Sequence, residues 1–223
     1  MIIINVTNAI IFTDYVTEDI TLTSDKEWVF ANTMVVQNGA TVTIEAGTTV
    51  KIANNAKIII CDNCRIFSNG TSENPVIITA ESGLWKGINI EGGEGFSFAT
   101  QIEGNPGDNL EDIKELPQLQ RAIFNFTNFM NFGSYTTGGS FFDGPAMFID
   151  CNFTNWSWNG GQAAIVANSL TENCNFTNGT GFSASNMKKL VGLNSQVTRN
   201  LSINSNIGDI ELWGNFTQDN LNG

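Results

Sequence analysis

The chain has 223 residues, enough for one sizeable domain with its own core. Ten Lys and Arg residues stand against 22 Asp and Glu residues, the net charge is −12, and His is absent. This balance argues against nucleic acid as a partner, and we interpret the acidity as a source of solubility. No run approaches the ~18–20 apolar residues of a membrane span, so no membrane insertion is expected. The start M-I-I-I-N-V-T also lacks the basic region of a signal peptide.

Residues 1–19 are predicted to form a leading strand and a cap over the open end of the structure that follows. Ile2, Ile3 and Ile4 belong to a bare apolar run, and contact with a partner chain is the alternative role for them. We expect a single domain over 20–216 and a polar end over 217–223.

Between residues 41 and 90 the chain consists of short apolar-alternating runs separated by Gly, Asn and Pro. Val, Ile and Thr dominate these runs, which indicates strands. The expected strands are 41–44, 50–52, 57–60, 65–67, 76–79 and 85–90. Leu22, Ile44, Ile66 and Ile88 stand 22 residues apart. A fixed period of this length predicts a solenoid of about eight or nine stacked coils.

An irregular stretch at about 92–120 interrupts the pattern and is predicted to be an insertion. Acidic residues followed by Pro117 indicate a short helix at 109–116 within it. Because loops carry function more often than repeated coils do, this insertion is a candidate contact region, and a lid over one side of the solenoid is the alternative.

A second irregular stretch, 130–146, is rich in Gly and aromatic residues. We expect Tyr135, Phe141 and Phe142 to be exposed there and to contact a partner.

The phrase C-N-F-T-N occurs at 151–155 and again, 23 residues later, at 174–178, and F-N-F-T-N stands at 124–128. The 23-residue spacing of these phrases is close to the 22-residue spacing in the first half of the chain. Two unrelated patterns with nearly the same period indicate that one kind of coil is repeated and stacked. The expected stacks are Phe126 with Phe153 and Phe176, Cys151 with Cys174, and the turn residues Asn128, Asn155 and Asn178.

The run G-T-S-E-N-P-V-I-I-T-A, the following L-W-K-G-I-N-I and the C-N-F-T-N phrases resemble pectate-lyase-like parallel β-helix proteins. These include bacterial surface proteins and bacteriophage spikes and fibres. The resemblance covers about 20–92 and 121–212 and implies an all-β fold, a right-handed parallel β-helix solenoid with coils of about 22–23 residues and a short helical insertion. It also implies that Trp85 is structural. Lyases, hydrolases, adhesins and inert shafts share this fold, so function depends on a site.

The four cysteines fit two disulfides, a metal site or reduced thiols. Cys61 and Cys64 form C-D-N-C, and 86 residues separate this pair from Cys151. Such a separation disfavours a shared zinc site, so we expect neither a metal nor another cofactor. Cys151 and Cys174 are interpreted as a buried ladder, and Cys61 and Cys64 as thiols at a turn.

Catalysis on this fold uses paired carboxylates or a basic residue beside calcium. The candidate acids are Asp143 with Asp150, or Glu91 with Glu94 and Glu103. No motif of the polysaccharide-degrading families surrounds them, so we do not expect an enzyme.

Glycan binding without catalysis uses exposed aromatic side chains. Trp156 and Trp158 alternate in N-W-S-W-N, and with Tyr135 and Asp143 they are the candidate ligand-binding residues. A place in the core is the alternative for the two Trp residues.

These features favour a structural virion protein of a bacteriophage: a head fibre, a capsid decoration protein, or a tail spike or fibre module. Its expected partners are virion proteins, further copies of itself in a homotrimer, and a host surface glycan. The alternative is a secreted or cell-surface bacterial β-helix protein, located extracellularly, that binds or degrades polysaccharide.

Overall fold

A computed structural model of the chain describes most of the first 180 residues and short strands after them. The described ranges are 4–6, 9–12, 14–91, 117, 119–134, 141–158, 166–167, 169–179, 182–183, 189–193, 196–197, 201–202, 209–213 and 217–218. The helix expected at 109–116, Ile2, Ile3 and Tyr135 lie outside them.

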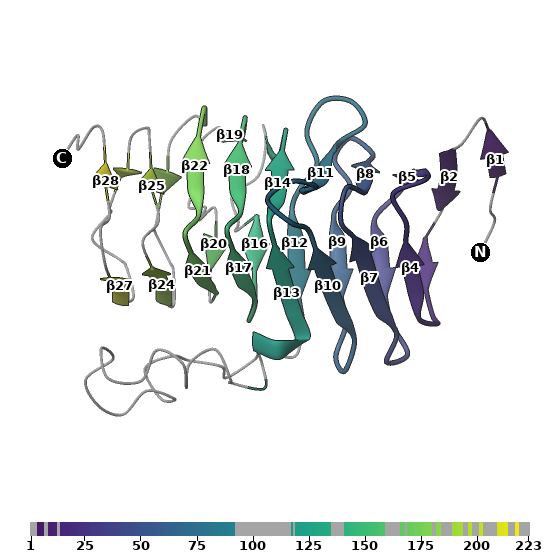
Figure 1. The fold of residues 1–223 in the computed structure, drawn as a ribbon, viewed down its shortest axis with the longest axis horizontal. Coiled ribbons are helices and arrows are strands. Elements are labelled where there is room, and N and C mark those ends of the chain that lie inside the picture. The colour runs from purple at the N-terminus through teal and green to yellow at the C-terminus, as the bar shows by residue number, and fades with distance from the viewer. Residues whose placement is uncertain are drawn as a thin grey trace.

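The strands form three long sheets, which we call sheets A, B and C, and each sheet gains strands from successive coils (Figure 1). Sheet A has the order β1 (Ile4–Val6), β2 (Ala9–Phe12), β5 (Glu27–Phe30), β8 (Thr49–Ile52), β11 (Val76–Ala80), β14 (Thr127–Met130), β18 (Asn152–Thr154), β22 (Asn175–Thr177), β25 (Gln196–Val197) and β28 (Thr217–Gln218). Sheet B has the order β3 (Tyr15–Val16), β6 (Met34–Val36), β9 (Ile58–Ile60), β12 (Ile88–Ile90), β16 (Phe142–Asp143) and β20 (Val166–Ala167). Sheet C has the order β4 (Ile20–Leu22), β7 (Thr41–Glu45), β10 (Arg65–Asn69), β13 (Ala122–Asn125), β17 (Met147–Ile149), β21 (Leu170–Glu172), β24 (Lys189–Leu193) and β27 (Asp209–Trp213).

The smaller elements lie at the corners between these sheets or beside them. They are the parallel pairs of β15 (Gly133–Ser134) with β19 (Ser157–Trp158) and of β23 (Phe182–Ser183) with β26 (Leu201–Ser202), and the 3-10 helix η2 (Leu119–Arg121).

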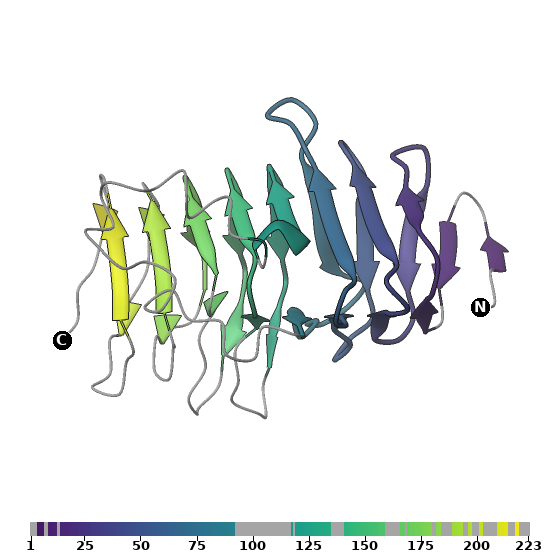
Figure 2. The ribbon, with the colours of Figure 1, turned by 90° about the horizontal axis from the view of Figure 1, so that it is seen from below.

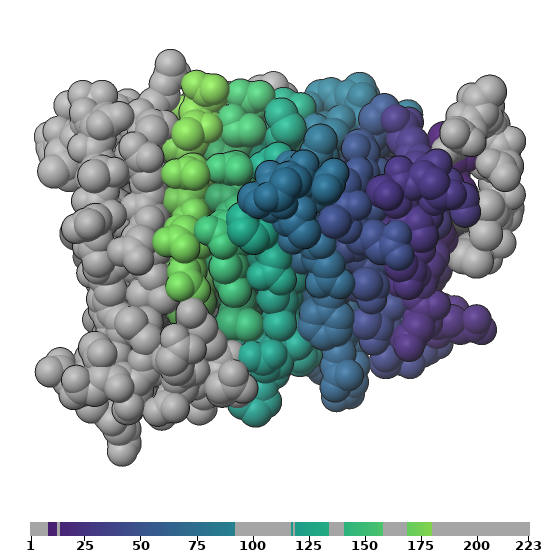
Figure 3. All heavy atoms as spheres, in the orientation of Figure 1, coloured from purple at the N-terminus to yellow at the C-terminus, as the bar shows by residue number. Residues whose placement is uncertain are grey.

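The chain passes from sheet A to sheet B to sheet C and then returns to sheet A one coil further along. From β2 onward, the strand pairs within the three sheets are parallel, so the fold is the expected parallel β-helix. Figure 2 shows strands following one another in a row, and the colour bands of Figure 3 cross the molecule in chain order. The eight described strands of sheet C, one per coil, agree with the expected number of coils.

The first strand breaks the parallel pattern. β1 pairs with β2 in antiparallel register, with Ile4 opposite Ile11 and Val6 opposite Ala9. An antiparallel strand ends the succession of parallel coils on this side of sheet A, and β1 and β28 lie at opposite ends of the molecule (Figure 1).

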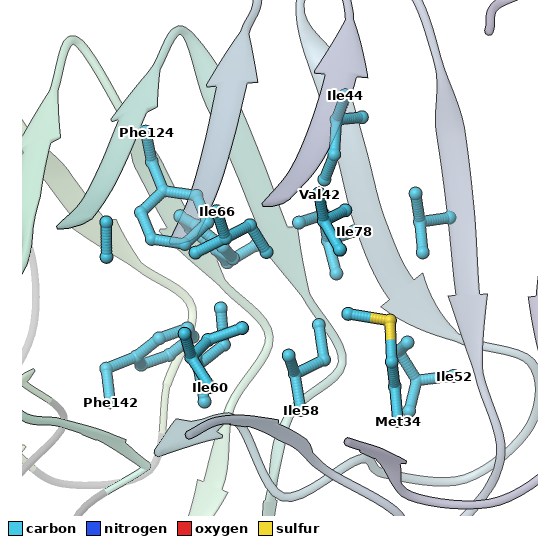
Figure 4. Close-up of a cluster of buried hydrophobic side chains, with 14 of the residues drawn as sticks. Met34, Val42, Ile44, Ile52, Ile58, Ile60, Ile66, Ile78, Phe124 and Phe142 are labelled. Carbon is cyan, nitrogen blue, oxygen red and sulfur yellow. The ribbon is translucent and has the colours of Figure 1, made fainter. Parts of the chain in front are cut away.

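Alternation of apolar and polar residues explains why these runs form strands around one core. In β7 the side chains of Val42 and Ile44 are buried, whereas Thr41 and Thr43 are half-buried on the outer side. Side chains from sheet B point into the same interior as those from sheet C, as Figure 4 shows for Ile58 and Val42. Burying one such aliphatic side chain stabilises the fold by about 1.5–3 kcal/mol.

Aromatic side chains are frequent in the core from β13 onward, as they are in the first coils at Phe12, Trp28 and Phe30. Phe129, Phe153 and Phe176 stack with ring centroids 4.9 and 4.7 Å apart, and Phe124 stacks on Phe148 at 5.1 Å. The expected place of Phe126 in the first ladder is wrong. Phe129 pairs with Phe153, because N-F-M at 128–130, and not F-N-F-T-N, aligns with N-F-T.

Phe126 instead turns the chain between sheets C and A, with a φ of 42°. Its backbone N–H donates to the carbonyl of Ile149, and Asp150 occupies the same corner one coil later with a φ of 52°. Left-handed backbone is costly for a bulky side chain, so the stacking of neighbouring coils must hold Phe126 in this conformation.

Of the three steps in the expected series from Leu22 to Ile88, only the first joins paired residues. Leu22 pairs with Ile44, but Ile44 pairs with Ser68, which is 24 residues later, and Ile88 lies in sheet B beside Ile58. Turns of different length lie between the strands, and alternation fixes only which side a residue faces. The 23-residue step of the C-N-F-T-N phrases is confirmed, since Phe153 pairs with Phe176.

Asparagine occupies the corner between sheets A and B in three successive coils. Asn131, Asn155 and Asn178 have φ values of 56°, 57° and 57°. Asn adopts left-handed backbone at lower cost than most residues, which explains the expected turn positions of Asn155 and Asn178. Asn128 does not lie at a turn but within β14.

The Phe129–Phe153–Phe176 ladder predicts a large cost for its middle ring. Replacing Phe153 by Ala is expected to lower the free energy of unfolding by about 3–5 kcal/mol, because it opens a cavity between two stacked rings. The matched control is Phe67→Ala, which truncates a half-buried ring on the outer side of β10. Urea denaturation followed by circular dichroism measures both changes, and equal losses would contradict the ladder's role.

Candidate functional site

A row of three asparagine side chains runs along the outer side of sheet A. In N-F-T the Phe points into the core, so Asn152 and Thr154 both face outward. The side-chain N–H of Asn152 donates to Asn128 Oδ1 at 2.8 Å, and that of Asn175 donates to Asn152 Oδ1 at 3.0 Å. Residues paired across parallel strands lie directly beside each other, so the three amides form one hydrogen-bonded ladder.

A second row runs parallel to the asparagines, two residues further along each strand. Its hydroxyl groups are joined where Thr177 Oγ1 donates to Thr154 Oγ1 at 3.1 Å, and Met130 stands next to Thr154 in the same row. We call the two rows together the amide face. Its six residues are Asn128, Met130, Asn152, Thr154, Asn175 and Thr177, all half-buried in the described chain and all uncharged.

The first coils of sheet A differ from the amide face in charge. There the Lys51 ammonium contacts the Glu27 carboxylate at 2.7 Å on the outer side of β5 and β8. Both side chains are substantially exposed, so the pair contributes little stability. The charged pair is therefore confined to β5 and β8, and the half-buried residues of sheet A from β11 to β22 are uncharged.

The outer side of sheet B carries a narrower row with one outward residue per strand. Tyr15, Val35, Ile59, Asn89 and Asp143 follow one another in the strand register. Tyr15 is 55% exposed and is the one large apolar side chain with high exposure among the residues whose burial is described. Asp143 is half-buried beside Asn89, and its side chain is not without an interaction partner.

The expected aromatic platform is not formed by Trp156. Its ring is buried and stacks on Phe132 with centroids 6.1 Å apart, and Gly179 leaves space for it, because a Cβ at 179 would overlap the indole. This is the core position considered as its alternative. The backbone of Trp158, in β19, pairs with that of Ser134 in β15. The side chain of Trp158 and the whole of Tyr135 lie outside the described part of the chain.

Phe141 and Phe142 are buried, so their expected exposure is wrong. Phe142 pairs with Ile88 in sheet B and contacts Trp85 at 5.8 Å between ring centroids. Trp85 is fully buried and donates its indole N–H to the carbonyl of Met130, in agreement with a structural role. Of the apolar run Ile2 to Ile4, only the backbone of Ile4 is described, and it pairs with Ile11.

The candidate acids do not meet on one described face. Asp143 lies in sheet B, whereas Asp150 lies at the corner between sheets C and A. Glu91 is exposed directly after β12, while Glu94 and Glu103 lie outside the described residues. The pairing of Asp143 with Asp150 for an inverting hydrolase therefore has no support in this geometry.

The cysteines belong to two separate places. Cys151 and Cys174 are fully buried free thiols, and their Sγ atoms donate to the carbonyls of Phe124 and Phe148, both at 3.2 Å. Burial, followed by the neighbouring Cys151, raises the pKa of the Cys174 thiol well above its usual range. The expected buried ladder of these two cysteines is therefore confirmed.

Cys61 and Cys64 begin and end a tight turn between sheets B and C. The N–H of Cys64 donates to the carbonyl of Cys61 at 3.1 Å, and both are free thiols. Burial, and then the neighbouring Glu91 carboxylate, raise the pKa of Cys61, so the thiolate form that attacks electrophiles is depleted. In the described part of the chain no group of three or more His, Cys, Asp or Glu residues is arranged to hold a metal ion.

Arg121 joins this turn to the end of the coil strand β12. Its guanidinium donates to the carbonyls of Cys61 at 2.8 Å, Cys64 at 3.3 Å and Glu91 at 3.0 Å. Glu91 ends the described chain before 92–116, and Arg121 ends η2 after it. The planar fork of an arginine suits several carbonyl acceptors at once. Sequence patterns gave no indication of this role.

Comparison with known proteins agrees with this geometry. Residues 14–103 match the family described as a pectate-lyase-like beta helix domain. The match covers less than half of the chain. No curated protein and no solved structure matches the chain. The protein is a parallel β-helix solenoid, a fold compatible with catalysis and with non-catalytic roles, and the match indicates a polysaccharide-related or structural protein.

The described part of the chain includes no helix that is long and apolar enough to cross a membrane.

Arg121 is expected to stabilise the corner that it joins. Replacing Arg121 by Ala should lower the free energy of unfolding by about 2–3 kcal/mol, because three carbonyls lose charged donors. Arg65→Ala is the control, since Arg65 is exposed on the adjacent strand β10. Thermal and urea denaturation measure both variants, and a loss no larger for Arg121→Ala than for Arg65→Ala would refute the role.

The raised pKa of Cys174 predicts a loss of stability in alkali. Above about pH 8.5 the unfolded thiol ionises while the native thiol stays protonated, so the unfolded state is favoured by up to about 1.4 kcal/mol per pH unit. The stability contributed by the native thiol is complete below that pH and is lost as the pH rises.

Urea denaturation between pH 7 and pH 10 measures this dependence. The Cys174→Ala variant is expected to show a shallower decline than the unchanged chain. An identical decline in both proteins would show that the buried thiol does not cause it.

Proposed function

We propose that the chain is a structural component of a bacteriophage particle: a head fibre, a capsid decoration protein, or a tail spike or fibre module that contacts a host surface glycan. The observation that carries this proposal is the continuous core. Inward residues of one coil stack on the equivalent residues of the next, as in the Phe129–Phe153–Phe176 ladder. Its partners under this proposal are virion proteins or further copies of the chain, for example in a homotrimer.

Rigidity supports this role. Backbone hydrogen bonds run from coil to coil even at the corners, for example from Ala53 N–H to the Phe30 carbonyl at 2.9 Å and from Cys61 N–H to the Val36 carbonyl at 2.9 Å. Local opening of one coil therefore breaks bonds to both neighbours, and such a structure resists proteases and transmits force along its axis.

The surface charge and the first strands also support it. The net charge is −12, and Asp14, Glu18 and Asp19 are exposed beside the short strands β3 and β4 at the start of sheets B and C. Charged residues at sheet edges oppose pairing with other strands. Crowded copies on a particle would remain separate except at their intended contacts.

A secreted or cell-surface bacterial β-helix protein is the second candidate function. The pectate-lyase-like match favours it, because it points to polysaccharides as partners. Such a protein would bind or degrade polysaccharide outside the cell, and both candidates share a surface that contacts glycan.

Location distinguishes the two candidates. Antibodies raised against the purified chain are expected to label phage particles from lysates of the source culture in immuno-electron microscopy. Mass spectrometry of density-gradient-purified particles should find the chain at a fixed ratio to the capsid protein.

The control is the particle-free culture supernatant and the surface of uninfected cells. Label confined to cell surfaces or to the supernatant would overturn the virion role and favour the secreted candidate.

A further inference from the structure

We propose that the amide face binds an extended neutral polysaccharide that lies parallel to the solenoid axis. This inference rests on the proposed glycan contact and names the face and the class of ligand.

The hydrogen-bonding capacity of the ladder supports a ligand. An Asn side chain has two N–H donors and two acceptor lone pairs. Asn152 uses one N–H toward Asn128 and one lone pair toward Asn175, which leaves one donor and one acceptor at the half-buried outer surface. Sugar hydroxyls both donate and accept, so each rung of the ladder can bind one hydroxyl pair.

The spacing of the rungs favours a polymer. Neighbouring strands in a sheet lie about 4.7–4.9 Å apart, so the amides repeat at that distance along the axis. The Thr row lies two residues across, at about 6.4–6.8 Å, which places both rows within reach of one extended chain. Because Asn128, Asn152 and Asn175 pair in register, the rows are straight and follow the axis.

The ladder also fixes the amides before any ligand arrives. Hydrogen bonds within each row restrict Asn152 and Thr154, and Phe153 between them is anchored in the core. Side chains that are already ordered lose little entropy on binding, which offsets the weakness of single hydroxyl contacts.

Charge selects a neutral ligand. The six residues of the amide face carry no charge, whereas the chain as a whole has a net charge of −12. An anionic polymer would find no counter-charge on this face and would be repelled by the rest of the surface. The half-buried Met130 adds an apolar contact for the non-polar edge of a sugar ring.

Affinity electrophoresis in gels that contain a defined polysaccharide tests the inference. The probes are dextran, mannan, galactan and hydroxyethylcellulose as neutral polymers and polygalacturonate as the acidic one. The unchanged chain is expected to be retarded by at least one neutral polymer and not by polygalacturonate.

Three variants locate the binding face. Thr154→Lys places a long charged side chain on the amide face and should weaken binding about tenfold or more. Thr154→Val replaces the hydroxyl with a methyl group of similar size and should weaken binding about two- to fivefold. The control Thr43→Lys adds the same charge to the half-buried outer side of β7 in sheet C and should bind like the unchanged chain. Circular dichroism and melting temperature confirm that the variants fold.

Each contrary outcome overturns the inference in a distinct way. If none of the neutral polymers retards the chain, or if only polygalacturonate does, the amide face does not bind a neutral polysaccharide. The structural role in a particle is then still decided separately, by the particle labelling. Unchanged binding by a folded Thr154→Lys variant places the glycan on another face and leaves the proposed glycan contact intact.

Discussion

In-register stacking is the constraint on which the structure depends. Described strands pair with the equivalent strand of the next coil, so an inward side chain rests on its counterpart one coil away, as in β14, β18 and β22. Like residues therefore gather in rows, such as Phe129, Phe153 and Phe176 inside. The same rule acts outside, where it aligns Asn128, Asn152 and Asn175. Core and candidate surface are two results of one register.

Stacking also requires unlike residues to fit where a row changes composition. Phe132 stacks on Trp156, and the next position, Gly179, leaves the space that the indole occupies. Between β14 and β15, and between β18 and β19, the chain must turn within two residues, which is why Asn131 and Asn155 have left-handed backbone. Phe126 adopts it at greater cost, so the register outweighs local preference there.

Much of the fold could be predicted from short-range pattern. Alternation in Thr41–Glu45 and the repeated C-N-F-T-N phrases indicated strands, a solenoid and the cysteine ladder, and the structure contains them. The prediction of a constant period was wrong because the turns differ in length, and the alternation of apolar and polar residues within strands gives no information about turn length. The burial of Phe142 was missed because β16 has only two residues, too few to show a period among the glycines around it.

The candidate surface was harder to predict, because it depends on which residues face outward together. The repeated C-N-F-T-N phrases indicated stacked Phe residues and a turn at the final Asn. The outward alternation of the first Asn and the Thr around the buried Phe was visible in them but was not used to predict a surface. Arg121 carries no local signal, since its three acceptors lie 30 to 60 residues away in the chain.

The 23-residue step between β18 and β22 has a consequence for how such a protein can change over generations. β18 and β22 present the same Asn and Thr to each other, and Phe153 rests on Phe176. Tandem duplication of this coil would place N-F-T on N-F-T in sheet A, the same junction that β18 and β22 already form. Gene-level copying errors could thus lengthen the molecule, rung by rung, with the packing of this part of sheet A already solved.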